Sequence, residues 1–378
     1  MAGLYIHIPF CQKRCIYCDF YSTVALSKRA AYTQALCREM EARAEYLHGE
    51  TLETVYFGGG TPSLLSHDQL SDIFQAISSV FSLSPDAEIT LEVNPDDVTD
   101  TFALQLARLP VNRVSMGIQT FNDHLLSLLG RRHTAIQAVE AVSRLRQCGI
   151  RNLSLDLIYG LPGQSLGAWE NDITQVLQRL HPEHLSAYAL IYEEGTRLWQ
   201  LRQQGQVTEA DEELSLEMYS LLMDKAKEAG YEHYEISNFA LPGWRSRHNS
   251  SYWADIPYLG CGPSAHSYDG RSRQWNKANL NAYIAADGNA VSEREELTPA
   301  IRHNEMLLKR LRTSDGLSMP LFSSTFGQTL AERFLKLARP HFEKGTLLYD
   351  EARQKVHLSR SGLFISDSII SDLFLEDS

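Results

Sequence analysis

The chain has 378 residues, a formal net charge of −12 and a hydrophobic fraction of 43%. Its length predicts one large domain and a smaller one, and its composition excludes a wholly disordered chain. The acidic balance disfavours binding to nucleic acid, which needs clustered lysine and arginine. Because no apolar run reaches the roughly 18 residues of a membrane span and no secretory signal is visible, we expect a cytoplasmic protein.

The first two thirds of the chain alternate between short apolar runs and helical patterns. The apolar runs predict six strands, at residues 4–8, 54–57, 89–93, 113–118, 153–157 and 184–188. The helical patterns lie at residues 27–47, 66–81, 135–147, 166–180 and 209–229. This alternation predicts an α/β fold with a parallel sheet, either open and doubly wound or a barrel. Both arrangements gather functional residues at the carboxyl ends of the strands.

Beyond residue 230 the pattern changes. Residues 231–268 are rich in aromatic residues, glycine and proline, and residues 271–296 are polar. The tail predicts a small winged-helix-like unit, with helices at 303–312, 331–342 and 359–373 and a hairpin of 347–349 and 355–358. We therefore expect three parts, at 1–230, 231–296 and 297–378. Because the tail is rich in acidic residues, we expect it to pack or to bind a partner rather than DNA.

Three of the six cysteines are clustered as Cys11-x-x-x-Cys15-x-x-Cys18, directly after the first predicted strand. Thiolates at such spacing bind an iron–sulfur cluster or zinc. A zinc site would need a fourth ligand from a distant part of the chain, whereas three cysteines leave one iron of a [4Fe-4S] cluster open. The other three cysteines are scattered, which predicts inert thiols.

In this position the cysteine motif resembles that of the radical S-adenosylmethionine (SAM) superfamily. Two further segments narrow the resemblance to oxygen-independent coproporphyrinogen III dehydrogenases and their relatives. They are Leu4-Tyr5-Ile6-His7-Ile8-Pro9-Phe10, before the first cysteine, and Gly58-Gly59-Gly60-Thr61-Pro62-Ser63. The resemblance implies that the three cysteines hold a [4Fe-4S] cluster, whose fourth iron binds the amino and carboxylate groups of SAM. It implies a SAM site that contains Tyr5, Gly59, Gly60, Thr61, Glu92, Gln119, Arg131 and Asp156.

The residue types agree with that implied role. Glycines let the backbone approach a ligand closely. Arg131 offers a planar fork for a carboxylate, and Glu92 and Asp156, at strand ends, suit ribose hydroxyls or an amine. Taken singly, each would more often mark a turn or a solvated charge. Their regular order after successive strands favours the functional interpretation.

Two features distinguish this chain from the dehydrogenases. Those enzymes carry a further cysteine two residues after the third, where this chain has Phe20. Downstream, His248-Asn249-Ser250-Ser251-Tyr252-Trp253 resembles the HNxxYW motif of the HemW heme chaperones. The resemblance implies a heme site at His248, Tyr252 and Trp253, in which an imidazole binds iron and aromatic rings stack on the porphyrin. His266 and Cys261 are rival heme ligands.

The resemblance therefore implies a partial (β/α)6 barrel with a small C-terminal helical domain, and a heme chaperone that delivers heme to heme-requiring respiratory proteins. Delivery to a membrane-bound acceptor would require peripheral membrane contact, and the resemblance implies that the chain can form a homodimer. The main alternative is a coproporphyrinogen III dehydrogenase of porphyrin biosynthesis. A third is a winged-helix regulator that senses redox state through the cluster, which the acidic charge disfavours.

Overall fold

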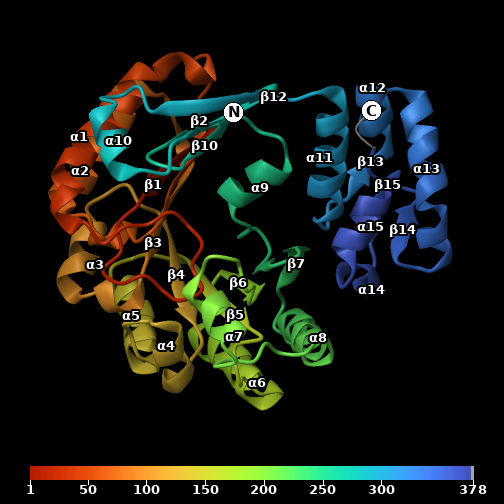
Figure 1. The fold of residues 1–378 in the computed structure, drawn as a ribbon, viewed down its shortest axis with the longest axis horizontal. Helices are drawn as coiled ribbons and strands as arrows, with labels where there is room; N and C mark the ends of the chain where they lie inside the picture. Colours follow the sequence, from red (N-terminus) through yellow and green to blue (C-terminus); the bar gives the residue numbers. More distant parts are fainter. Residues whose placement is uncertain (376–378) are drawn as a thin grey trace.

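The computed structural model describes residues 1–375 and is built around one long sheet (Figure 1). Six parallel strands stand side by side in chain order: β1 (Ala2–Ile8), β2 (Leu52–Gly59), β3 (Leu83–Val93), β4 (Arg113–Gln119), β5 (Asn152–Tyr159) and β6 (His184–Ala189). The six predicted strands are confirmed. The sheet ends in β12 at one edge and β7 at the other, so the barrel is partial, as predicted.

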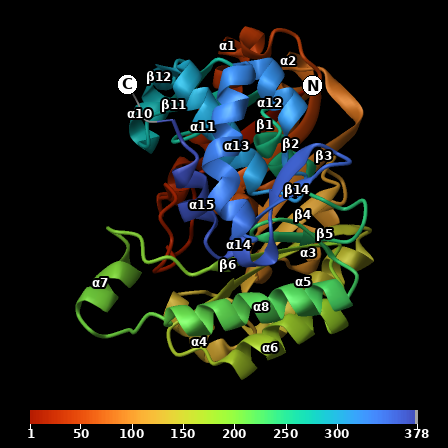
Figure 2. The ribbon, with the colours of Figure 1, turned by 90° about the vertical axis from the view of Figure 1, so that its right-hand side faces the viewer.

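Helices connect and follow the parallel strands: α1 (Arg29–Ala42), α2 (His67–Val80), α3 (Asp100–Leu106), α4 (Asp123–Leu129), α5 (Ala135–Gln147), α6 (Leu166–Thr174), α7 (Arg197–Gln203) and α8 (Glu212–Glu228). The predicted helix at 166–180 changes to a π-helical turn at Gln175–Leu180. Helices α3, α4 and α7 were not predicted, because each has 7 residues and shows little periodicity. Figure 2 shows α6 and α8 lying side by side.

The segment after α8 extends the sheet at both edges, although no strand was predicted in it. Strands β7 (Glu232–Glu235) and β8 (Asn238–Ala240) form a hairpin whose β8 pairs with β6. The chain then crosses to the other edge, where β9 (Tyr258–Cys261) pairs in parallel with β1. The remaining elements there are β10 (His266–Tyr268), β11 (Ser272–Asn276), α10 (Leu280–Ala285) and β12 (Val291–Glu296).

The two faces of the parallel sheet differ in chemistry because side chains alternate along a strand. On β4, Val114, Met116 and Ile118 belong to the buried apolar core, which packs against the surrounding helices. The intervening Arg113 and Ser115 lie on the opposite face and line a pocket. The helices therefore stabilise the sheet from outside, and the polar residues gather inside the partial barrel.

The C-terminal part has its own apolar core around Phe322 and Phe334. It contains α11 (Pro299–Leu311), α12 (Met319–Phe326), α13 (Gln328–Glu343), α14 (Arg360–Leu363) and α15 (Ser366–Asp372), with a small sheet of β13 (Leu317–Ser318), β14 (Leu347–Asp350) and β15 (Lys355–Leu358). The predicted helical domain and its hairpin are confirmed. The predicted closing helix at 359–373 is instead two short helices, α14 and α15.

Helix α9 (Arg247–Trp253) lies between the sheet and the C-terminal helices (Figure 1). An ion pair of 2.6 Å between Lys309 of α11 and Asp255, just after α9, joins the two parts. Arg360 of α14 pairs with Asp224 of α8. Within residues 1–375, no helix combines the length and apolar character needed to cross a membrane.

Candidate functional site

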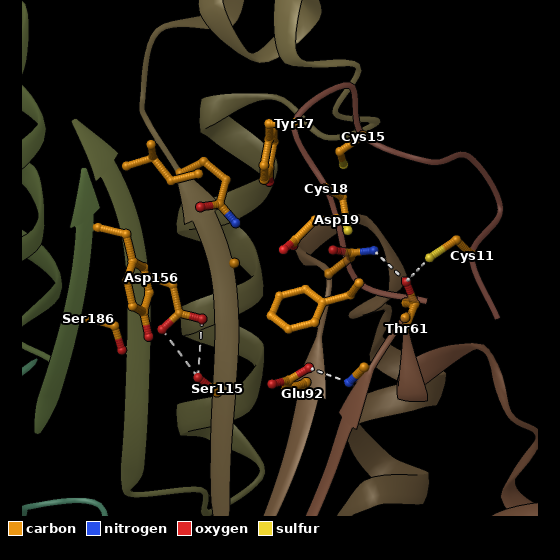
Figure 3. A pocket seen from close by; sticks show the side chains of 18 of the residues that line it. Cys11, Cys15, Tyr17, Cys18, Asp19, Thr61, Glu92, Ser115, Asp156 and Ser186 are labelled. Carbon is orange, nitrogen blue, oxygen red and sulfur yellow. Dashed lines mark hydrogen bonds between the residues drawn. The ribbon is translucent and has the colours of Figure 1, made fainter. Parts of the chain in front are cut away.

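A pocket of about 460 Å³ opens at the carboxyl ends of the parallel strands (Figure 3). Its size lies in the range of small-molecule sites. The structure brings ten of the predicted site residues to its lining: Cys11, Cys15, Cys18, Gly59, Gly60, Thr61, Glu92, Gln119, Arg131 and Asp156. Because these residues come from six different segments of the chain, only the parallel order of the strands explains their meeting.

The three cysteines lie on one loop that leaves β1. Its base is closed by two backbone hydrogen bonds, from Cys11 N to Thr23 O at 2.9 Å and from Thr23 N to Pro9 O at 2.7 Å. A third bond, from Ile16 N to Leu129 O at 3.1 Å, ties the loop to the end of α4. The loop therefore has fixed ends, and Figure 3 shows its cysteines along one side of the pocket.

The thiols have polar neighbours that suit an anionic sulfur cluster. The Thr61 hydroxyl donates to Cys11 Sγ at 3.7 Å, and the Arg131 guanidinium donates to Cys15 Sγ at 3.7 Å. Burial raises the pKa of Cys18 to about 11, so a bound metal would have to displace this proton.

Within residues 1–375, no three potential ligands stand close enough to share one metal ion. In a cubane cluster each thiolate binds a different iron, so its ligands stand farther apart than those of a single ion. The loop therefore fits a cluster better than a mononuclear zinc site.

Arg131 lines the pocket, where its guanidinium can contact a bound ligand. It donates to Asn94 Oδ1 at 2.8 Å and to the Gly117 carbonyl at 2.5 Å, which fixes its orientation. Its Nε is buried and has no hydrogen-bond partner among the described residues. A buried donor without a partner is costly, and a bound carboxylate would satisfy it.

Glu92 on β3 and Asp156 on β5 line the pocket from either side of β4. Glu92 accepts from the Tyr56 hydroxyl at 2.7 Å and from Gly59 N at 3.2 Å. Burial is the main reason that the pKa of Glu92 is raised to about 7. Burial also raises the pKa of Asp156, whose carboxylate accepts from Ser115 at 3.2 Å. Each carboxylate therefore gains from a ligand that brings hydroxyl or ammonium donors.

Two backbone positions in the pocket tolerate little change. Gly59 has a φ of +105°, and a Cβ there would lie 2.6 Å from the His7 ring. Gln119 adopts a φ of +70°, which is uncommon for a residue other than glycine. Glycine adopts such a φ without strain, whereas Gln119 is held there by its surroundings, and non-glycine positions of this kind cluster at ligand sites.

Sequence reasoning missed Arg113 and Asn249, which line the same pocket. Arg113 is 1% exposed, and its Nε has no partner among the described residues. Its charge counteracts the rise in the pKa of Glu92 and Asp156. The signal that was available is the alternation along β4, which places Arg113 on the face that carries Gln119.

The remaining predicted residues do not line the pocket. Tyr5 lies deeper in the barrel, where its hydroxyl bonds His7 Nδ1 at 3.0 Å. His248 is 2% exposed, with Nδ1 bonded to the Thr54 hydroxyl and Nε2 to the Tyr252 hydroxyl, both at 2.8 Å. Burial lowers the pKa of His248 to about 3, so its imidazole is neutral. Neither ring nitrogen is free to bind iron in this arrangement.

The HNxxYW segment is instead tied into the scaffold. The Glu88 carboxylate accepts from the backbone N–H groups of Arg247 and His248, at 3.1 and 3.0 Å, at the start of α9. Trp253 is partly buried at the end of this helix. Heme binding by His248, Tyr252 and Trp253 thus stays a prediction, and the segment reaches the pocket through Asn249.

The two rival heme ligands lie elsewhere. His266 is exposed on β10 and stacks on Trp275, with ring centroids 5.5 Å apart. Cys261 is fully buried at the end of β9, and burial raises its pKa well above the usual range for a thiol.

Comparisons with known proteins cover nearly the whole chain. Residues 5–176 match the Radical SAM superfamily, and residues 297–365 match the HemN C-terminal domain. The heme chaperone HemW of Lactococcus lactis is 34% identical, over 99% of this chain and 97% of its own length. The heme chaperone HemW of Bacillus subtilis is 36% identical, over 98% of both chains. The solved structure of Escherichia coli coproporphyrinogen III oxidase (HemN), a radical SAM enzyme, is 25% identical with a TM-score of 0.85, over 99% of this chain and 90% of that chain.

Proposed function

This chain belongs to the HemW family of the radical SAM superfamily, and we propose that it is a heme chaperone, which binds heme and transfers it to heme-requiring respiratory proteins. The observation that carries the proposal is the similarity to two heme chaperones along nearly the full length of each chain. Phe20, which replaces the further cysteine of the dehydrogenases, supports it.

We propose further that Cys11, Cys15 and Cys18 hold a [4Fe-4S] cluster and that the pocket beside them binds SAM. The unpartnered Nε of Arg131 would meet the carboxylate of SAM, and Glu92 and Asp156 would accept from its ribose or ammonium groups. When bound, the cluster would supply the electron that reductive cleavage of SAM requires. The loop hydrogen bonds would keep the three cysteines at the mouth of the barrel.

The proposed partners are heme and its acceptor proteins, met in the cytoplasm or at the membrane surface, with the chaperone acting as a homodimer. Vesicle flotation and analytical ultracentrifugation would test the last two points. Flotation with vesicles of neutral phospholipid is expected to recover the protein, since a chain with a net charge of −12 would be repelled by anionic lipid. Sedimentation is expected to give twice the mass of one chain.

One experiment separates the chaperone from the dehydrogenase. Anaerobically reconstituted protein is first titrated with heme and then mixed with a heme-free acceptor, such as an apocytochrome. We expect the protein to bind heme in the titration and to pass it to the acceptor after mixing. A second sample is incubated with coproporphyrinogen III, SAM and a reductant. If the protein converts two propionate side chains to vinyl groups and binds no heme, the proposed chaperone function is wrong and the chain is a dehydrogenase.

A further inference from the structure

Three large apolar side chains are exposed at the mouth of the pocket. Phe20, on the cysteine loop, is 63% exposed; Tyr188, at the end of β6, is 43% exposed; and Ile191, just after β6, is 64% exposed. All three line the pocket, together with the cysteines. A single exposed apolar residue is ordinary, but three at one pocket mouth form a surface that a ligand would cover.

The interior of the pocket does not have room for both proposed ligands. Its roughly 460 Å³ suits one small molecule beside the cluster, and its polar groups, Arg131, Glu92 and Asp156, suit SAM. A porphyrin is a broad apolar plate and would leave these polar groups unsatisfied. Heme would then lie over the opening of the pocket rather than inside it. The HNxxYW segment offers no free imidazole nitrogen, because His248 is bonded at both ring atoms.

The mouth also carries the charges that heme propionates require. Lys13 and Arg14 are exposed and line the pocket beside Phe20. Lys13 makes no ion pair with any described residue, and Arg14 donates to the carbonyl oxygens of Cys18 and Phe20, both at 3.3 Å. Asp19 and Glu193 line the same pocket, so the propionate edge is expected on the side of Lys13 and Arg14.

We infer that heme binds at this mouth, with one porphyrin face on Phe20, Tyr188 and Ile191 and with its propionates toward Lys13 and Arg14. This inference rests on the proposed heme chaperone function and locates its cargo. Aromatic and aliphatic side chains are the usual contacts of a porphyrin face. The position of Phe20 agrees, because a cysteine at that place in the dehydrogenases would offer no such surface.

The test compares aspartate substitutions at the mouth with aspartate substitutions at equally exposed positions elsewhere. Phe20→Asp and Ile191→Asp are expected to weaken heme binding by about tenfold or more, because a charge replaces apolar contact area. Ile136→Asp and Leu104→Asp are the matched controls, since these residues are 70% and 60% exposed on α5 and α3 and lie outside the pocket lining. The measurement is a heme titration followed by Soret absorbance, with the iron content of each protein determined in parallel.

Phe20 is two residues from Cys18, so Phe20→Asp could disturb the cluster. If this variant loses iron, the heme affinity of Ile191→Asp decides the test. Lys13→Glu is expected to weaken heme by about threefold, and heme dimethyl ester, which lacks the carboxylates, should bind the parent and Lys13→Glu equally. Parent-like heme affinity in both aspartate variants, with heme bound by the parent, would overturn the mouth site and leave the chaperone function standing. Absence of heme binding by the parent would overturn the proposed function itself.

Discussion

Sequence motifs pointed to both the pocket at the strand ends and the α9 segment. The buried polar groups of the two regions differ in whether the protein satisfies their hydrogen bonds. In the pocket, Arg131 and Arg113 each keep a buried Nε without a partner, and Glu92 is held with a raised pKa. On α9, His248 uses both ring nitrogens within the protein.

Buried polar groups are normally hydrogen-bonded, so the exceptions need an explanation. The unpartnered Nε atoms of Arg131 and Arg113 lie in the pocket, where a ligand can satisfy them, whereas His248 on α9 has a partner at each ring nitrogen. His248 also stacks on Tyr56, with ring centroids 5.0 Å apart, and Tyr56 donates to Glu92. The α9 segment therefore supports the pocket from behind, and the following predictions test this division of roles.

The largest effect is expected at the cysteine loop. Cys15→Ala removes one of three thiolates, and a [4Fe-4S] cluster cannot be held by the remaining two, so iron binding should be lost. Cys148→Ala is the control, because Cys148 is the residue at the C-terminus of α5 and does not line the pocket. Iron and sulfide analysis after anaerobic reconstitution measures both. Equal iron in Cys15→Ala and the parent would contradict the cluster assignment.

A smaller effect is expected for SAM binding. Arg131→Ala removes a charge-assisted hydrogen bond of about 1.5–3 kcal/mol, so SAM affinity should fall about ten- to hundredfold. Arg132→Ala is a matched control: the neighbouring guanidinium pairs with Asp96 at 2.8 Å and Asp97 at 2.9 Å and does not line the pocket.

Calorimetric titration of cluster-loaded protein is the measurement for both arginine variants. If the two variants bind SAM alike, Arg131 does not belong to the site.

These contrasts also show what could be predicted from sequence. Glu92, Gln119 and Asp156 could be predicted to meet because each lies in the carboxyl half of a strand, and parallel strands end at one edge. Arg113 lies at the start of its strand. How deep it sits in the pocket depends on the pairing of Arg113 with Thr90 and Asn152 of the two neighbouring strands, and the sequence of one strand does not encode this register.

The orientation of His248 could not be predicted for a different reason. The HNxxYW spacing places His248 and Tyr252 four residues apart on one helix face, but whether that face meets solvent or the sheet depends on tertiary packing. Likewise, the exposure of Phe20 follows from the path of the cysteine loop, which lacks regular structure.

The raised pKa of Glu92 predicts that increasing pH strengthens SAM binding and lowers the stability of the ligand-free protein. Its pKa is raised from 4.5 to about 7, mainly by burial, so the carboxylate that SAM needs is ionised only above that pH. SAM affinity should be about tenfold weaker at about pH 6 than at about pH 8. Without ligand, the protonated form favours folding, so its contribution to stability is present below about pH 4.5 and is lost as pH rises through about 7.

Glu92→Gln should remove both pH effects, since its amide does not titrate. The variant should bind SAM weakly at every pH, and at about pH 8 the ligand-free variant should be at least as stable as the parent. Calorimetry and thermal unfolding from about pH 5 to about pH 9 measure the two effects. A parent whose SAM affinity is flat across this range would show that Glu92 does not titrate as inferred.

The smallest effect on heme is expected at His248. In His248→Ala the hydroxyl groups of Thr54 and Tyr252 lose their partner, which should cost about 1–3 kcal/mol of folding free energy. Because the imidazole makes no contact at the mouth, heme affinity should stay within about twofold of the parent and the Soret band should not move. SAM affinity should fall slightly, since Tyr56 would lose the ring that supports its bond to Glu92. A shifted Soret band with unchanged stability would instead make His248 an iron ligand, and α9 would then have to open to admit heme.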